Sequence, residues 1–474
     1  MIPPHAESLA SRFSRLQAAA RSDPNPDRAL RERRLQALDR LLLDHEPALA
    51  DAVRRDFGHR SPAETRLLEV FPSHQAIRHA RRHLRRWMRP QRRPVALWFQ
   101  PGSAELRYQP LGAVGIIVPW NYPIFLAAAP LAAALAAGNR VLVKMSEITP
   151  ATAALFAELV GKYFADDELA VVEGDAGVAR EFSRLPFDHL LFTGSTAVGR
   201  QVMRAAADHL TPVTLELGGK SPAIIGPGPA ASADFAHAVE RIVVGKCLNA
   251  GQTCIAPDYV LLPAGTEQAF IDHARQVVAR CYPHLDHAAD YSTIVDQRQY
   301  ARLAAYVEEA RAAGAKIVEI SPRAVADPVK RRLPPLLLLE VGDGLRVMQE
   351  EIFGPLLPLV PYGDLDEAIR YVNSRPRPLA LYYFDRQPAN IERVLDETVS
   401  GGVTINDTIL HIAQDELPFG GVGPSGMGCY HGFAGFETFS VRKGVFRQSR
   451  WSAIGLFKPP YGALFDRLTK VLLR

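Results

Sequence analysis

The sequence contains few cysteines, little net charge and no hydrophobic leader, and each shortage excludes a class of protein. Its 4 cysteines among 474 residues are too few for a disulfide scaffold, so free thiols in a reducing, cytoplasmic compartment are expected. Residues 1–12 hold no apolar core of signal-peptide length. With 47% hydrophobic and 22% charged residues and a net charge of +4, the composition excludes a wholly disordered chain. The length predicts about three domains.

Residues 111–138 carry no charge and are long enough to span a membrane. Three prolines interrupt the stretch, and each removes backbone hydrogen bonds that lipid cannot replace. Residues 113–118 are short, apolar and β-branched, which predicts a buried strand. Residues 124–137 are rich in Ala and Leu and precede Gly138, which predicts a buried helix. We therefore expect a strand, the polar turn Trp120-Asn121-Tyr122 and a helix, with no transmembrane span.

From there on, predicted strands alternate with helical stretches, a rhythm that is typical of a doubly wound parallel sheet. The strand candidates are residues 140–143, 169–172, 189–192, 213–217 and 223–225. A second alternating block runs from about residue 235 to 406. No repeat or low-complexity linker separates the two blocks, and the segment Gly218-Gly219 is taken as their boundary.

A basic segment, residues 78–94, contains eight arginines and two histidines but no acidic residue. Such runs occur in nucleic-acid-binding surfaces, but no aromatic platform or binding motif accompanies this one. A solvated helix face with Ile77, Leu84 and Trp87 packed inward explains the same pattern, so no nucleic-acid partner is expected. After it, residues 95–100 and 105–109 predict the two strands of a hairpin.

Cys254 ends the glycine-containing turn Asn249-Ala250-Gly251-Gln252-Thr253-Cys254. A nucleophilic cysteine needs a pKa lowered by a helix N-terminus or backbone donors, and a loop position that meets substrate. Cys247, Cys281 and Cys429 lie in more ordinary settings. A single cysteine is more often packed than catalytic, so on this ground both interpretations of Cys254 stay open.

Polar or small residues also follow three of the predicted strands. Glu216 lies between two leucines, where burial would raise its pKa and prepare a general base; a paired strand-end carboxylate is the alternative. Gly194 and Ser195 separate a strand from a helix, a position at which backbone N–H groups bind diphosphate, or simply a tight turn. Lys144 and Glu147 are able to hydrogen-bond ribose hydroxyls. No metal site is predicted.

Taken together and in order, these segments resemble the aldehyde dehydrogenase superfamily. Seven motifs carry the resemblance: Pro119-Trp120-Asn121-Tyr122-Pro123, 144–147, 192–199, 215–222, 251–254, Glu350-Glu351-Ile352-Phe353-Gly354-Pro355 and Leu417-Pro418-Phe419-Gly420-Gly421. The segments 256–259 and 426–432 look like the class 3 branch, and within it like bacterial coniferyl aldehyde dehydrogenases. Met145 stands where the family usually has proline, and the spacing between Glu216 and Cys254 is slightly longer than usual.

The resemblance implies a catalytic set. The thiolate of Cys254 would attack the aldehyde carbon, and the Asn121 side chain with the Cys254 backbone N–H would hold the oxyanion, a contribution of about 3–4 kcal/mol. After hydride transfer, Glu216 would activate the water that hydrolyses the thioester.

The resemblance also implies a site for NAD, with NADP left open. Lys144 and Glu147 would hold the adenosine ribose, and Gly194 with Ser195 would meet the diphosphate. Glu351 would bind the nicotinamide ribose. The remaining expected cofactor contacts are Trp120, Leu217 and Phe353.

The implied fold is α/β, with two doubly wound parallel-sheet domains and a small β oligomerisation flap. The expected divisions are 1–94 with 110–217 for the cofactor, 218–410 for catalysis, 95–109 with 433–448 for oligomerisation, and 449–474 as a tail. A homodimer is expected. Charged residues interrupt every apolar run of the tail, so a span is excluded, while peripheral membrane contact or packing on a partner stays open.

The predicted activity is NAD(P)-dependent oxidation of a small-molecule aldehyde, aromatic such as coniferyl aldehyde or medium- to long-chain aliphatic, to its acid. A cofactor-independent thiol hydrolase would need a histidine near Cys254, and nothing in the sequence predicts one. A CoA-acylating dehydrogenase would not need Glu216. A non-catalytic binding protein would not need the reacting groups at all.

Overall fold

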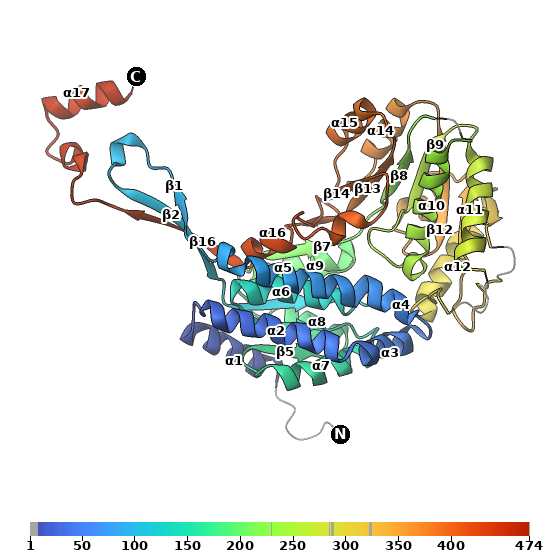
Figure 1. Cartoon of the computed structure of the whole chain (residues 1–474), viewed down its shortest axis with the longest axis horizontal. Coiled ribbons are helices and arrows are strands. Elements are labelled where there is room, and N and C mark those ends of the chain that lie inside the picture. Colours follow the sequence, from blue (N-terminus) through green and yellow to red (C-terminus); the bar gives the residue numbers. More distant parts are fainter. Residues whose placement is uncertain (1–7, 229, 284, 286–288, 322–324, 474) are drawn as a thin grey trace.

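The fold was analysed in a computed structural model that describes residues 8–228, 230–283, 285, 289–321 and 325–473. Two helix-flanked sheets lie side by side, and a narrow three-stranded extension projects from one end with the C-terminal helix beyond it (Figure 1). This arrangement confirms the predicted α/β fold class.

The first sheet has six strands and is parallel apart from one edge strand. Its order is β15 (Gly426–Met427), β7 (Val213–Glu216), β6 (His189–Thr193), β3 (Ala113–Ile117), β4 (Arg140–Lys144) and β5 (Leu169–Val172). The antiparallel edge strand β15 returns from the distant C-terminal part of the chain and pairs Gly426 with Glu216. The predicted strands at 113–118, 140–143, 169–172, 189–192 and 213–217 are thereby confirmed.

The second sheet has seven strands, parallel except at β10. Its order is β10 (Lys316–Glu319), β11 (Leu336–Leu339), β12 (Leu356–Tyr362), β9 (Tyr259–Pro263), β8 (Pro222–Ile225), β13 (Ala380–Phe384) and β14 (Gly402–Ile405). The chain passes from the first sheet to the second between β7 and β8, so Gly218 and Gly219 lie at the crossing.

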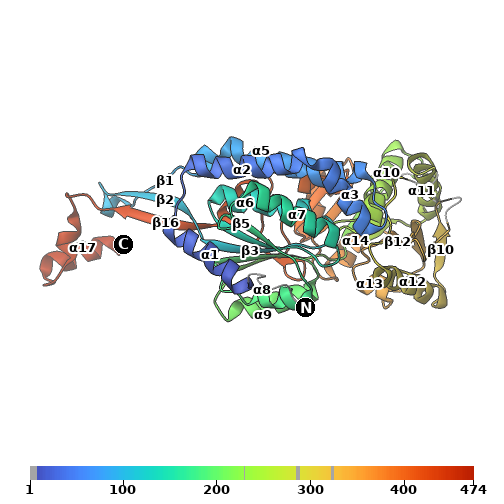
Figure 2. The same cartoon turned by 90° about the horizontal axis from the view of Figure 1, so that it is seen from below.

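Helices cover both faces of the first sheet, as Figure 2 shows, with α2, α5, α6 and α7 on one side and α1, α8 and α9 on the other. Their bounds are α1 (Leu9–Ser22), α2 (Arg28–Asp44), α3 (Glu46–Phe57), α4 (Pro62–Thr65), the π-helical turn η1 (Arg66–Val70), α5 (Phe71–Trp87), α6 (Phe125–Ala137), α7 (Pro150–Tyr163), α8 (Ala176–Ser183) and α9 (Thr196–Ala207).

The second sheet and the C-terminal part carry the remaining helices. They are α10 (Ala233–Cys247), η3 (Leu248–Gly251), α11 (Glu267–Cys281), α12 (Gln297–Ala312), α13 (Arg346–Gln349), α14 (Leu365–Asn373), α15 (Pro388–Glu397), η4 (Leu410–Ala413), α16 (Gly432–Thr438), η5 (Ala453–Phe457) and α17 (Ala463–Leu472).

The uncharged stretch forms the predicted strand β3 and helix α6. Every residue of α6 is buried, because α2, α5 and α16 pack around it over the first sheet. Gly138 ends the helix at φ +97°, a left-handed conformation that glycine adopts without steric cost. Within the described residues, every helix is too short or too polar to span a bilayer.

The predicted hairpin at residues 95–109 is wrong in its first strand. Residues Leu97–Phe99 form a single turn, η2, between two prolines that cannot donate to a ladder, and only the short β1 (Gln91–Arg93) pairs on that side. The long partner of β2 (Ser103–Pro110) is instead β16 (Ser440–Arg447), antiparallel over its whole length. The strand expected after Phe436 thus completes the extension.

Candidate active site

Cys254 follows a backbone that turns sharply at the end of α10. Asn249 and Ala250 have φ values of +50° and +51°, and Gly251 continues the left-handed course at +75°. A Cβ on Gly251 would lie 2.3 Å from the carbonyl oxygen of Gly354, so only glycine allows this approach. The turn ends with Cys254 half-buried beside a cavity.

The thiol of Cys254 experiences opposing influences. Burial, followed by the carboxylates of Glu351 and Glu216, raises its pKa, while the backbone N–H groups of Cys254 and Ile255 lower it. The net direction is upward, opposite to the lowered pKa that a nucleophilic cysteine needs. A positive charge supplied by a ligand beside the sulfur would reverse this balance.

Asn121 lies in the turn between β3 and α6, where the sequence places the polar interruption. Its side-chain amide donates to the carbonyl oxygen of Gln252 at 3.2 Å, and its own carbonyl accepts from the Asn249 amide at 3.1 Å. The turn and the cysteine loop are therefore joined directly, two residues before the thiol.

A buried ion pair holds the backbone of this turn. The guanidinium of Arg60 donates to the Asn121 carbonyl at 2.8 Å and lies 3.1 Å from the Glu69 carboxylate. Both side chains are 0% exposed. The Glu69 carboxylate also accepts from the backbone N–H groups of Ile124 and Phe125 at the start of α6. Sequence reasoning missed this pair, because nothing in the separation of Arg60 from residue 121 indicates the contact.

Glu216 ends β7 with its side chain buried, and neither carboxylate oxygen has a hydrogen-bond partner among the described residues. Burial raises its pKa well above the ordinary value, as the sequence predicts for a general base. An unpaired buried carboxylate costs free energy, so the alternative of a paired strand-end carboxylate does not describe this residue.

One cavity of about 210 Å³ brings most of the predicted residues together. It is lined by Pro119, Trp120, Asn121, Leu126, Thr193, Gly194, Ser195, Glu216, Leu217, Gly218, Cys254, Gln299, Arg302, Glu351 and Phe353. Lys144 and Glu147 are not among its lining residues. The Trp120 ring meets Phe353 edge to face at 5.2 Å between centroids.

Glu351 reaches the cavity from the segment between α13 and β12. Burial raises its pKa to about 8, against the Gly219 backbone donor that lowers it. A Cβ on Gly218 would lie 2.2 Å from both carboxylate oxygens, so glycine is required opposite this side chain. One carboxylate oxygen is buried without a partner in the described part of the chain. A ribose hydroxyl donating to this oxygen would satisfy it.

The other polar positions around the sheet edge also suit a dinucleotide. Ser195 caps α9 by accepting from the N–H of Val198, and this leaves the first turn of a 12-residue helix at the cavity wall. The ammonium of Lys144, 1% exposed, donates to the Met145 carbonyl at 2.6 Å and lies 3.7 Å from the Glu147 carboxylate. Burial lowers the pKa of Lys144.

Aromatic and histidine side chains pack together near Glu216 and Cys254, since burial is followed by this carboxylate and this thiol in raising the pKa of Tyr430. His431 stacks on Phe419 at 5.4 Å between centroids and meets Tyr430 at 4.5 Å, and His411 also stacks on Phe419, at 5.9 Å. Within the described residues, the Tyr430 hydroxyl, both His431 nitrogens and the Nε2 of His411 are buried without partners. The sequence marks this segment as a motif but does not predict that its polar atoms are left free.

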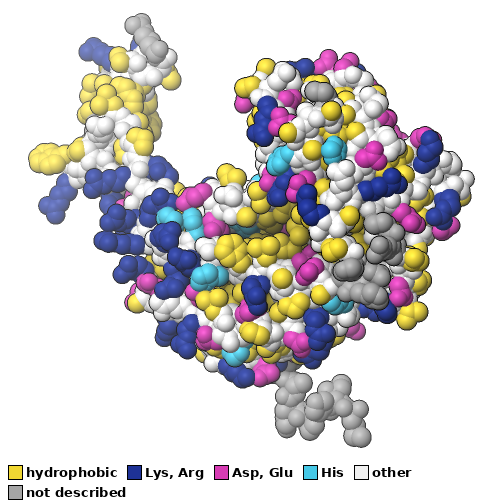
Figure 3. Space-filling model, turned by 45° about the vertical axis from the view of Figure 1, so that its right-hand side comes forward, with side chains coloured by type: hydrophobic (Ala, Val, Ile, Leu, Met, Phe, Trp, Pro, Cys, Tyr) yellow, Lys and Arg dark blue, Asp and Glu magenta, His cyan; other side chains and the backbone are white. Residues whose placement is uncertain are grey.

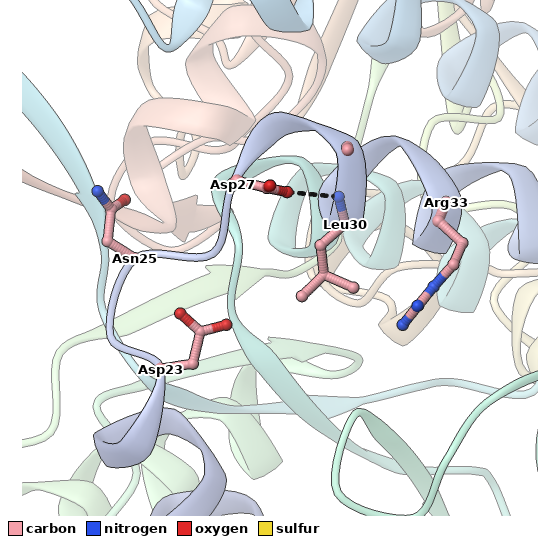
Figure 4. Close-up of a pocket in the computed structure, with 6 residues that line it drawn as sticks. Asp23, Asn25, Asp27, Leu30 and Arg33 are labelled. Carbon is pink, nitrogen blue, oxygen red and sulfur yellow. Dashed lines mark hydrogen bonds between the residues drawn. The ribbon is translucent and has the colours of Figure 1, made fainter.

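A second cavity, of about 600 Å³, lies at the start of α2 (Figure 4). Asp23, Asn25, Asp27, Leu30 and Arg33 point around it, and the Asp27 carboxylate already accepts from the Leu30 backbone N–H at 2.8 Å as the cap of α2. None of the side chains that line it is a thiol. The chemistry therefore concentrates at the cavity of Cys254.

Comparison with known proteins decides the family. The profile of the aldehyde dehydrogenase family matches residues 13–445. The chain belongs to this family. It is therefore an aldehyde dehydrogenase, an oxidoreductase that converts aldehydes to acids with a nicotinamide cofactor, NAD or NADP.

Individual relatives resemble this aldehyde dehydrogenase over nearly its full length. A probable coniferyl aldehyde dehydrogenase of Pseudomonas aeruginosa is 54% identical, covering 97% of this chain and 95% of the relative. The coniferyl aldehyde dehydrogenase of Pseudomonas sp. strain HR199 is 47% identical, covering 99% and 97%. The solved structure of Staphylococcus aureus AldH in a substrate-bound state superposes with a TM-score of 0.92 at 35% identity, covering 98% and 100%.

Proposed function

We propose that Cys254, Glu216 and Asn121 carry out the oxidation in this aldehyde dehydrogenase. The observation that carries the proposal is the buried, unpartnered carboxylate of Glu216, which opens on the same cavity as the Cys254 thiol and the Asn121 amide. A structural carboxylate in that position would be paired; a base awaiting a water would not.

The Cys254 sulfur, as thiolate, forms a bond to the aldehyde carbon, and the carbonyl oxygen becomes an oxyanion. The Asn121 amide, released from the Gln252 carbonyl, donates to this oxygen together with the Cys254 N–H. Oxidised nicotinamide, which Glu351 and Phe353 would hold beside the sulfur, would supply positive charge and the hydride acceptor needed to convert this adduct into a thioester on Cys254. Glu216 then takes a proton from a water whose oxygen attacks the thioester, the C–S bond breaks, and the acid is released.

We further propose that the cofactor is NAD. It would lie along the first sheet, with Gly194 and Ser195 at the diphosphate, Trp120 and Leu217 beside it, and Phe353 against the ring. Glu351, with one oxygen free, would hold the nicotinamide ribose.

At the adenosine ribose, Lys144 and Glu147 compete in their effect on a 2′-phosphate. The Lys144 ammonium is already engaged by the Met145 carbonyl, whereas Glu147 is exposed and would repel the phosphate. We expect a higher kcat/KM with NAD than with NADP. In Glu147→Gln the ratio should shift toward NADP by several-fold, since one repulsive charge is removed; an unchanged ratio would contradict the role of this residue.

For the substrate, we propose aromatic aldehydes of the coniferyl type, which the relatives from Pseudomonas are named for. Among the described residues, the polar atoms of Tyr430, His411 and His431 that lack partners lie between aromatic rings, and they would suit a phenyl ring that carries hydroxyl and methoxyl groups. A panel of coniferyl aldehyde, cinnamaldehyde and hexanal should give the highest kcat/KM with coniferyl aldehyde. In His431→Phe the ratio of kcat/KM for coniferyl aldehyde to that for cinnamaldehyde should fall. Equal kcat/KM values for the three aldehydes in the parent protein would refute the substrate class.

We also propose a homodimer and a division of labour between the sheets. The first sheet with residues 1–94 and 110–217 would hold the cofactor, and the second with 218–410 would supply the nucleophile. The extension presents Leu97, Trp98, Phe99 and Phe446, each at least 47% exposed, and faces a hollow with a hydrophobic floor (Figure 3). A second subunit in this hollow would cover them. Sedimentation of the parent should give twice the chain mass, and Leu97→Asp with Phe446→Asp should lower it.

The compartment and the tail complete the proposal. Four free cysteines, one of which carries the reacting thiol, fit the reducing cytoplasm. The tail 449–474 forms η5 and α17 with apolar side chains in solvent, among them Trp451, Leu464 and Val471. Either a partner subunit or weak peripheral contact with a membrane would cover them. Flotation with anionic vesicles separates the two, since only membrane contact brings the protein to the lipid fraction.

A further inference from the structure

Three metal-ligating side chains, two of them on α5, lie together outside the cavity of Cys254. His79 and His83 are one helical turn apart, so their rings lie on one face of the helix. Glu416 joins them from the segment between η4 and the motif that contains Phe419. One nitrogen of each ring and one carboxylate oxygen lie within 4.8 Å of one another.

The two imidazoles are prepared to offer lone pairs. The Nδ1 of His83 faces the His79 carbonyl at 2.9 Å, and because a carbonyl only accepts, this nitrogen carries the proton. With a proton on Nδ1, the other ring nitrogen, Nε2, is the one that can present a lone pair, and it lies 3.9 Å from the Glu416 Oε1. The Nε2 of His79 is buried and has no hydrogen-bond partner among the described residues.

The separations are close to those of a coordination shell. The Glu416 Oε1 lies 3.5 Å from the Nε2 of His79 and 3.9 Å from the Nε2 of His83. Ligands of a tetrahedral zinc ion at bond lengths of about 2.0–2.1 Å are roughly 3.3 Å apart. Rotation of the Glu416 side chain, which is 63% exposed, can shorten both of its distances to the imidazole nitrogens.

We propose that His79, His83 and Glu416 bind a divalent transition-metal ion with the ligand preference of zinc, with water completing the shell. Two imidazoles and one carboxylate are a donor set that suits Zn²⁺ and disfavours Mg²⁺ or Ca²⁺, which take oxygen ligands. This site replaces the expectation from sequence that the chain holds no metal.

Neighbouring cations oppose the ion: Arg82 and Arg86 both act on His79, and Arg86 has to move because it also contacts Glu416. The Arg86 guanidinium lies 4.0 Å from the Glu416 oxygen, and its side chain is 66% exposed. An exposed arginine pair of this kind is weak, so its loss costs little when the metal takes the carboxylate. Arg86 can turn into solvent without leaving a buried charge unpaired.

The position of the site indicates what the ion would do. It would clip α5, in the N-terminal helix layer, to the segment that precedes Phe419, whose ring stacks on His431 and His411. A metal that binds only the folded chain stabilises it. The bound ion would thus hold the side chains of Phe419, His411 and His431 in place without contacting the reacting groups.

Zinc also binds thiolates, so the test is made in the full chain with Cys254→Ser. Zn²⁺ is titrated by calorimetry into this protein and into the same protein carrying His83→Asn or Glu416→Gln, both of which change partly exposed side chains. The control is His237→Asn, which alters a histidine bonded to the Asn406 carbonyl at 3.1 Å in another part of the fold. The thermal midpoint is recorded with and without Zn²⁺.

We expect one bound Zn²⁺ per chain and a raised thermal midpoint in the Cys254→Ser protein and in the His237→Asn control. The association constant should fall at least tenfold in His83→Asn and in Glu416→Gln, and the shift of the midpoint should disappear. No binding to the Cys254→Ser protein would overturn the proposal. So would binding of equal strength in both site variants, since the ion would then be held elsewhere, for example by the remaining cysteines.

Discussion

Replacing Arg60 by methionine should destabilise the protein more than the same replacement of any surface arginine. Its guanidinium is fully buried between the Glu69 carboxylate and the Asn121 carbonyl, and it packs over the Tyr122 ring at 4.7 Å. Methionine fills much of the same space but leaves the Glu69 charge without a cation. Breaking a buried ion pair in this way costs about 3–5 kcal/mol.

The assay is urea unfolding followed by fluorescence, compared at the first transition because a protein of this size need not unfold in one step. The matched control is Arg54→Met, which removes an exposed arginine that lies 2.6 Å from Asp51 and should change the midpoint very little. Arg60→Met together with Glu69→Gln should recover part of the loss, since glutamine keeps an oxygen for the Ile124 N–H but carries no charge.

The pH dependence provides a second check on the same variant. Burial raises the pKa of Glu69, and Arg60 lowers it, so removal of Arg60 raises it further. When the pKa of a carboxyl is higher in the folded than in the unfolded state, the free energy of unfolding falls as pH rises. The loss of stability in Arg60→Met should therefore grow with pH. The reasoning is refuted if Arg60→Met loses no more than Arg54→Met, or if the double variant is no more stable than the single one.

Three further outcomes are expected. Cys254→Ser should lower reduced-nicotinamide formation by at least about a hundredfold, given the weaker nucleophile, while Cys281→Ser, an exposed thiol, keeps full activity; similar losses in both would contradict the assignment. Asn121→Ala should lower kcat by about 10²–10³ through loss of one oxyanion donor, and an effect on KM alone would argue against that role. Burial lowers the pKa of His411 to about 4 and of His431 to about 3. Unfolding therefore takes up protons below pH ~6.5, and the stability of the protein should fall as pH drops from there. His431→Phe should reduce this pH dependence, as measured by urea midpoints from pH 7 to 5.

Local sequence patterns predicted the parallel strands of the first sheet because each of these strands has its own apolar signal. β5 has the predicted bounds, and the proline-interrupted stretch became a strand, a turn and a helix. These elements depend on apolar periodicity and on nearby glycine or proline, all of which are visible within a short window.

The errors and omissions concern contacts between distant parts of the chain. β2 pairs with β16, more than three hundred residues away, rather than with its neighbour, because two prolines and a turn remove the nearer strand. The same limit hid the pair of Arg60 and Glu69, and it hid the free polar atoms around His431. The nucleophile loop was predicted as a segment, but the upward direction of the Cys254 pKa depends first on burial and then on carboxylates that the fold brings near the thiol.

The central claim is that Cys254 forms a thioester that Glu216 hydrolyses, and a single turnover of Glu216→Gln tests it most directly. Glutamine keeps the size of the side chain but cannot take the proton from water. After rapid mixing with NAD and coniferyl aldehyde, the account predicts one equivalent of reduced nicotinamide per active site, then a stall, with an acyl group on Cys254 in the peptide mass spectrum. Undiminished steady turnover, or a burst without an adduct on Cys254, would contradict it.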